Sequence, residues 1–234
     1  MYTLSNKIGF WSATLLALTF IVWIVCFISI TATSPLFYWT NFSDYLIFAD
    51  KNSQFLQNTA KLFMLLFSPL YVVLISSFYD RVSKNKKILI RISLLFGIAF
   101  AVLSSLHYFV QLSSVRINIE NGDTAGLEQF IQANPISIIS SINMLGWTLF
   151  LGLSSLFLLP IFPNDKLSRI IKYALLCNGI SCLFGGVGYV LQIDILTFSL
   201  MNLGMGGAML CFAITSAILF WKNTNSDFNY TFVI

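Results

Sequence analysis

The segment that decides the fold is Arg91–Arg116, with the sequence RISLLFGIAFAVLSSLHYFVQLSSVR. Between its two terminal arginines it contains no Asp, Glu, Lys or Arg. An apolar segment of this length predicts a helix that crosses a membrane. Near its far end lies His107, the only histidine of the chain. An ionisable side chain inside a membrane span is costly, so His107 is the first candidate for a functional residue.

The composition extends this prediction to the whole chain. Of its 234 residues, 57% are hydrophobic and 9% are charged, whereas soluble domains average about 45–50% and about 25%. So few charged side chains cannot cover a surface that faces water. We therefore expect an integral membrane protein with a single transmembrane domain over residues 1–234, whose first partner is the lipid bilayer.

Five further apolar segments accompany the first, so we predict an all-α bundle of six transmembrane helices. The predicted spans are residues 8–31, 62–79, 88–112, 136–159, 173–191 and 195–221. Two longer connections separate spans one and two and spans three and four. In the second of these, Leu127, Phe130 and Ile131 have the spacing of one helical face. We therefore expect short helices that lie in the outer membrane interface.

The distribution of basic residues predicts the orientation, since basic residues concentrate on the cytoplasmic side of membrane proteins. Six spans put both termini on one side of the membrane. That side carries Lys7, Arg81, Lys84, Lys86, Lys87, Arg91, Lys166, Arg169, Lys172 and Lys222. The opposite side carries only Lys51, Lys61 and Arg116. We therefore expect both termini in the cytoplasm, and the bacterial inner membrane as the location.

Several polar side chains fall inside the spans, in or near the outer half of the membrane. These candidate ligand-binding residues are His107, Gln111, Asn143, Trp147, Tyr189, Gln192 and Asn202. Polar side chains avoid lipid, so they should turn toward the bundle interior and meet. Two interpretations remain open. The residues form hydrogen bonds between helices, which contribute about 0.6 kcal/mol each, or they line a polar pocket that opens outward.

The sequence assigns no catalytic residue, metal site or cofactor. A catalytic metal usually needs three protein ligands, and His107 has neither a second histidine nor a carboxylate at comparable depth. The four cysteines contain no Cys-x-x-Cys pair, so a thiol–disulfide oxidoreductase is not indicated. No Gly-x-Ser-x-Gly or His-Glu-x-x-His motif occurs. No long basic segment indicates a nucleic-acid partner.

The run HYFVQLSSVR at residues 107–116 is followed by Gly126-Leu127, Asn134-Pro135 and Leu145-Gly146-Trp147. Together these motifs resemble a group of uncharacterised bacterial membrane proteins of similar length. The resemblance covers residues 105–165 best. It implies a six-span fold and no particular activity.

Three functional hypotheses follow from the sequence. The first is binding or transport of a small, partly apolar molecule, or of a lipid, in an outward-facing polar pocket. The second is a membrane-embedded enzyme that uses His107 as acid or base. The third is a structural or accessory subunit of a membrane complex, in which the polar residues only join helices. The absence of a carboxylate within the spans weighs against the second hypothesis, and the sequence leaves the oligomeric state and any partner subunit open.

Overall fold

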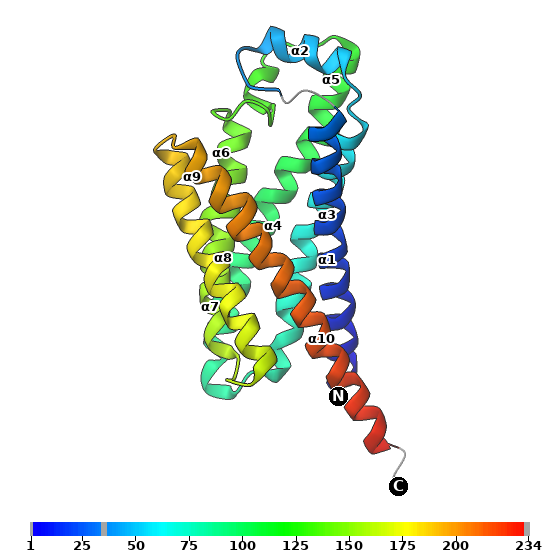
Figure 1. Cartoon of the computed structure of the whole chain (residues 1–234), viewed down its shortest axis with the longest axis vertical. Helices are drawn as coiled ribbons and strands as arrows, with labels where there is room; N and C mark the ends of the chain where they lie inside the picture. Colours follow the sequence, from blue (N-terminus) through cyan, green and yellow to red (C-terminus); the bar gives the residue numbers. More distant parts are fainter. Residues whose placement is uncertain (1, 34–36, 232–234) are drawn as a thin grey trace.

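The computed structural model describes residues 2–33 and 37–231. Within these residues the structure is 87% helical and contains no strand. Most of the helices run side by side along the longest axis of the molecule (Figure 1). The all-α class predicted from the composition is therefore confirmed.

Within residues 2–33 and 37–231, six helical segments are long and apolar enough to cross a membrane. They are Leu4–Thr33, Phe55–Arg81, Lys84–Asn121, Ile138–Ile161, Lys166–Val190 and Asp194–Lys222. The first lies in α1 (Tyr2–Thr33), the second begins with α3 (Phe55–Phe78) and the fifth is α8 (Lys166–Val190). The third contains α4 (Lys87–Val110), η3 (Gln111–Val115) and α5 (Arg116–Asn121). The fourth contains α6 (Ile138–Leu145), η5 (Gly146–Phe150) and α7 (Leu151–Leu158), and the sixth contains α9 (Asp194–Phe198), η7 (Ser199–Met205) and most of α10 (Gly206–Thr231).

The third long helix continues past residue 112, where the sequence suggested its end. Arg116 does not stop the helix, because its guanidinium donates to the carbonyl of Leu112 at 3.0 Å and to the carboxylate of Glu120 at 2.9 Å. The guanidinium charge of Arg116 is therefore paired by groups of the same helix, on its exposed side. The helix ends at Gly122, whose φ of 75° is the left-handed conformation that glycine adopts readily.

The bundle has two distinct ends. Helix α1 begins and α10 ends at one of them, which we call the terminal end (Figure 1). The opposite end, which we call the α2 end, carries α2 (Phe42–Lys51), α5 and the short turn η4 (Leu127–Phe130). The short helix expected in the first connection is therefore present as α2. In the second connection the expected helical face of Leu127, Phe130 and Ile131 does not form, because η4 ends at Phe130, Ile131 is extended, and Phe130 is exposed while Leu127 and Ile131 are buried. Helix α2 begins where the side chain of Asn41 accepts a hydrogen bond from the backbone N–H of Asp44 at 2.9 Å.

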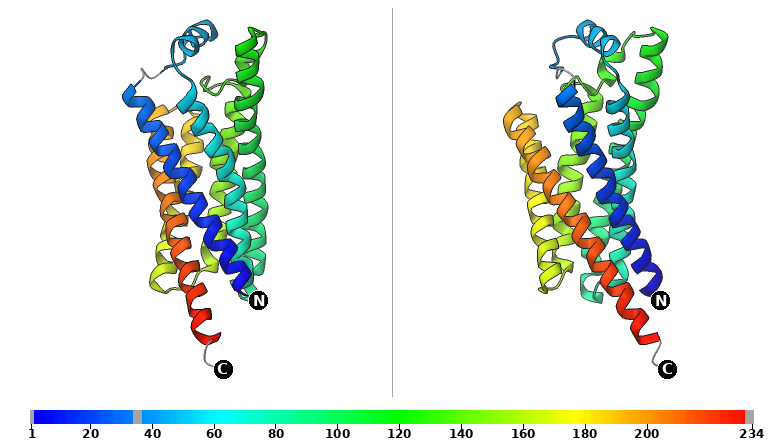
Figure 2. Two further views of the ribbon diagram at one scale, coloured as in Figure 1. Left: turned by 90° about the vertical axis from the view of Figure 1, so that its right-hand side faces the viewer. Right: turned by 45° about the vertical axis from the view of Figure 1, so that its right-hand side comes forward.

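Helix α1 packs against α3 and α10. Toward the α2 end, however, α10 and the preceding η7 and α9 lean away from α1 (Figures 1 and 2). The main apolar core follows the length of the bundle and includes Phe67, Tyr71, Phe100 and Phe212. A second, smaller core of Tyr45, Val115, Leu127 and Ile131 joins α2, η3 and η4 at the α2 end. Between the two cores lies the candidate site.

Candidate functional site

Two neighbouring cavities lie in the α2 half of the bundle. The Lys61 cavity, of about 370 Å³, is formed by α1, α2, α3, α4 and the segment after η4. The Trp147 cavity, of about 150 Å³, lies among α1, α3, α4, α6, η5 and η7. Four residues line both cavities: Trp23, Met64, Tyr108 and Gln132. The two cavities are therefore adjacent parts of one site. The volume of the Lys61 cavity alone falls within the range of small-molecule pockets.

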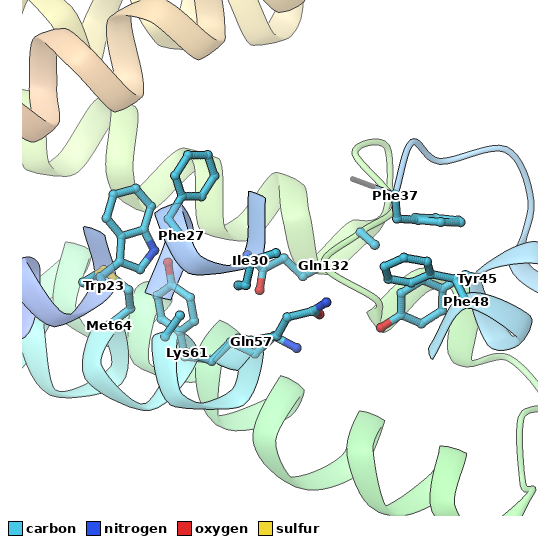
Figure 3. A pocket seen from close by; sticks show the side chains of 13 residues that line it. Trp23, Phe27, Ile30, Phe37, Tyr45, Phe48, Gln57, Lys61, Met64 and Gln132 are labelled. Atoms are coloured by element: carbon cyan, nitrogen blue, oxygen red, sulfur yellow. The ribbon is translucent and has the colours of Figure 1, made fainter. Parts of the chain in front are cut away.

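The walls of the Lys61 cavity are largely aromatic. Helix α1 contributes Trp23 and Phe27, and the α2 region contributes Phe37, Tyr45 and Phe48. Figure 3 shows these two groups of rings on either side of a central group of polar side chains from Gln57, Lys61 and Gln132. Apolar walls around a few convergent polar groups are the usual composition of a small-molecule site.

Tyr45 closes the cavity near α2 and also belongs to the smaller core. Burial raises the pKa of the Tyr45 phenol above its ordinary value, because the phenolate would lose its hydration. Tyr45 is therefore neutral at physiological pH. It contributes an aromatic face and a hydroxyl to the site, and no negative charge.

Lys61 is the only charged side chain among the residues that line its cavity. It lies one helical turn after Gln57, and residues four apart share a helix face. No acidic side chain in the described ranges lies within 4.0 Å of its ammonium group. Lys61 also lines a further cavity of about 620 Å³ between α2, α3 and α5, together with Asp50 and the ion pair of Arg116 and Glu120. The arrangement gives the aromatic cavity one positive charge without a carboxylate to pair with it.

The Trp147 cavity contains buried polar atoms that lack a hydrogen-bond partner. Trp147 is only 5% exposed. Its indole ring stacks on the ring of Phe67, with 5.5 Å between the ring centroids, and meets the ring of Phe100 edge-on, with 4.8 Å between the centroids. In the described part of the chain, neither Trp147 Nε1 nor Asn143 Oδ1 has a hydrogen-bond partner, although the Tyr108 hydroxyl lies beside both. Buried polar groups in proteins are normally hydrogen-bonded. A donor and an acceptor at one cavity therefore indicate a place for a polar ligand group or water.

Three π-helical turns interrupt long helices of the described residues, and two of them contribute to the Trp147 cavity. They are η3, η5 and η7, and they carry the predicted site residues Gln111, Trp147 and Asn202 respectively. A π turn widens the helix locally and changes the direction of its side chains, and such turns are frequent at functional sites. Trp147 and Asn202 line the same cavity from two such turns on different helices.

His107 and Gln111 are buried, but they line neither of the adjacent cavities. Sequence spacing suggested Gln111 and Asn143 as partners for His107. The structure instead places His107 Nδ1 at 3.2 Å from the carbonyl oxygen of Ile139, to which Nδ1–H donates a hydrogen bond. Gln111 Nε2 donates to the carbonyl of Phe130 at 2.6 Å, and the backbone N–H of Gln132 donates to Gln111 Oε1 at 3.0 Å. Gln111 therefore ties the segment around η4 to η3, and it lines the 620 Å³ cavity.

The other predicted residues divide between cavity and surface. Asn202 lines the Trp147 cavity, where it joins Asn143 and Trp147. The hydroxyl of Tyr189 donates to the carbonyl of Pro135 at 2.6 Å and lines none of the three cavities. Gln192 is exposed in the turn between α8 and α9, with a φ of 57°. The structure therefore does not place all seven residues in one pocket.

Sequence reasoning did not select the residues that the two cavities share, nor Lys61. Trp23 and Met64 looked like ordinary apolar residues of a span. Lys61 looked like a charge at the beginning of the second span. The available signal was the spacing of Gln57 and Lys61, because the second long helix begins already at Phe55 and places both side chains on one face.

No protein-family model, curated protein or solved structure matches the chain. The residues of the cavities therefore carry the functional argument.

Proposed function

We propose that this protein binds, or carries across a bilayer, a small and partly apolar molecule held in the Lys61 and Trp147 cavities. The observation that supports the proposal is a pair of adjacent, mostly aromatic cavities next to the buried polar atoms of Asn143 and Trp147, which lack partners within the described residues. Aromatic walls suit the apolar part of a ligand. The Trp147 Nε1 donor and the Asn143 Oδ1 acceptor, with the Tyr108 hydroxyl beside them, suit a polar part of the ligand or its hydration.

We further propose a bacterial inner-membrane location with both termini in the cytoplasm. The support is the excess of lysine and arginine near the terminal end of the bundle. In that orientation the α2 end faces outward, and the ligand enters from the outer leaflet or the outer aqueous phase.

An enzyme that uses His107 as acid or base has weaker support. The His107 side chain is fully buried, its Nδ1 is engaged with the Ile139 carbonyl, and it lines neither cavity of the site. A group that transfers protons to a substrate must come within hydrogen-bond reach of it.

The binding proposal is tested by the thermal stability of the purified protein in neutral-lipid nanodiscs, with and without single-chain probes. The probes are decanol, decanoate and decylamine, which share a chain and differ in head group. A ligand that binds only the folded protein raises its stability, by about 2.7 kcal/mol at a hundredfold excess over its Kd. We expect at least one probe to raise the melting temperature in a saturable manner.

Two variants of α3 locate this effect. Ala60 is buried and lines the Lys61 cavity, so Ala60→Phe should fill the space and abolish the stabilisation. Leu62→Phe adds bulk at a position that is 45% exposed on the outside of the bundle, and it should respond like the parent protein. If no probe stabilises the parent, or if Ala60→Phe responds as strongly as the parent, the binding proposal is wrong.

A further inference from the structure

We propose that the ligand is an amphiphile with an anionic head group, and that Lys61 binds this head group. The inference rests on the proposed function and specifies the chemical class of the ligand. It concerns the one charged side chain that the Lys61 cavity contains.

The ammonium group of Lys61 lies among aromatic side chains without an acidic partner in its cavity. A charge taken partly out of water is destabilising unless a counter-charge or several hydrogen bonds compensate it. No carboxylate of the described residues lies within 4.0 Å of the Lys61 ammonium. Asp50 and Glu120 line the 620 Å³ cavity with Lys61, but neither lines the Lys61 cavity, and Glu120 is paired with Arg116. The phenol of Tyr45, which lines the Lys61 cavity, is neutral. His107 is near enough to Lys61 to interact with it electrostatically, but a histidine cannot supply negative charge. The missing counter-charge therefore corresponds to the head group of a ligand.

The polar neighbours of Lys61 suit the same head group. Gln57 and Gln132 line the cavity with Lys61, and the three side chains lie together between the two groups of rings in Figure 3. Each carboxamide offers N–H donors and the ammonium offers three more. Donors of this kind form charge-assisted hydrogen bonds with carboxylate or phosphate oxygens.

Part of the remaining surface suits an apolar chain, while Asn143 Oδ1 and Trp147 Nε1 in the same cavity provide hydrogen-bonding groups for water. Beyond Trp23 and Met64, the Trp147 cavity continues along Phe20, Met201 and Met205. Methionine side chains are flexible and adapt to irregular apolar ligands. The site thus places a positive charge at the α2 end and an apolar path toward the middle of the bundle, which matches the two ends of an amphiphilic anion.

A cationic ligand fits this arrangement less well, although aromatic rings attract cations. The ammonium of Lys61 would repel a second cation, and no acidic residue lines either cavity. A neutral amphiphile would leave Lys61 without a counter-charge. The order of affinity expected from the structure is therefore decanoate, then decanol, then decylamine.

The experiment measures the affinity of all three probes for the full-length protein in nanodiscs of phosphatidylcholine, by calorimetry or by the ligand dependence of the melting temperature. We expect decanoate to bind at least about tenfold more tightly than decanol, because hydrogen bonds to charged groups are the stronger ones. This comparison uses the parent protein and does not depend on the folding of any variant.

Charge variants then assign the preference to Lys61. Lys61→Gln should bind decanoate and decanol equally, whereas Lys61→Arg should keep the preference for the acid. Lys51→Gln removes an exposed charge at the same end of the bundle that lines none of the three cavities. It should behave like the parent, which controls for attraction of the acid to the protein surface.

Two kinds of molecule could supply the anionic head group: a free single-chain acid, or an anionic phospholipid of the bilayer. Nanodiscs doped with phosphatidylglycerol separate them, because a bilayer source predicts a stabilisation by this lipid that Lys61→Gln abolishes. A Lys61-dependent response to either source supports the inference. If decanol binds the parent as well as decanoate does, the inference is wrong and the binding proposal stands. If none of the probes binds, the binding proposal fails first.

Discussion

His107, the residue that the sequence marked first, lines neither of the adjacent cavities, and its Nε2 is buried without a hydrogen-bond partner in the described part of the chain. Its Nδ1 donates to the carbonyl of Ile139 on α6, 32 positions further along the chain. The neighbouring Gln111 likewise bonds to backbone groups, at Phe130 and Gln132. Both residues therefore join the third and fourth spans and the segment between them. Within a membrane such bonds contribute about 0.6 kcal/mol on average, and up to about 1.7 kcal/mol.

If His107 has only this structural role, two substitutions of it should differ in their effect on stability. We expect His107→Gln to fold with a nearly unchanged melting temperature, because glutamine retains a donor for the Ile139 carbonyl. His107→Leu should lose about 0.6–1.7 kcal/mol of stability, since it removes that donor. Both variants should still be stabilised by decanoate. A well-folded His107→Gln that no longer binds any probe would show instead that the imidazole contacts the ligand.

At the scale of elements, glycines set the distance between α8 and the last span. A side chain at Gly204, in η7, would overlap Ser181 of α8. A side chain at Gly185 would lie 2.6 Å from Met201 Sδ, and one at Gly188 would lie 2.8 Å from Thr197 Oγ1. Small residues at these positions allow the close backbone approach that joins transmembrane helices. Met201 of η7 lines the Trp147 cavity, so this packing also helps to position one wall of the site.

A matched pair of substitutions tests the packing. Gly204→Leu should destabilise the protein by about 1–3 kcal/mol, because the added side chain has no room against α8. Gly207→Leu introduces the same side chain three residues later, where an added Cβ would meet no atom within 4 Å. It should be neutral, or stabilising by about 0.5–1 kcal/mol, because leucine favours a helix more than glycine does. Thermal unfolding in one detergent compares the two, and equal losses in both variants would contradict the close contact at Gly204.

At the scale of the whole molecule, the sequence predicts the six helices well, because long apolar runs without charges have few other solutions in a membrane. It predicts the site less well. Asn143, Trp147 and Asn202 line one cavity, but Lys61 does not belong to any apolar pattern, and Trp23 is one apolar residue among many in its span. The spacing of residues along one helix determines which face they share. It does not determine which helix lies opposite, or where a π turn changes that face.

The orientation of the molecule determines which side of the membrane supplies the ligand, and cysteine labelling tests it. Lys51 is exposed on α2, and Lys166 is exposed at the first residue of α8, at the terminal end. In a background where Cys26, Cys177, Cys182 and Cys211 are alanine, Lys51→Cys and Lys166→Cys each supply one thiol in a loop or helix end. We expect a membrane-impermeant maleimide to label Lys51→Cys in intact bacterial spheroplasts and Lys166→Cys only after lysis, because the basic terminal end should face the cytoplasm. The reverse pattern would place the α2 end, and with it the Lys61 cavity, in contact with the cytoplasm, so that the anionic amphiphile would have to come from the inner leaflet or from within the cell.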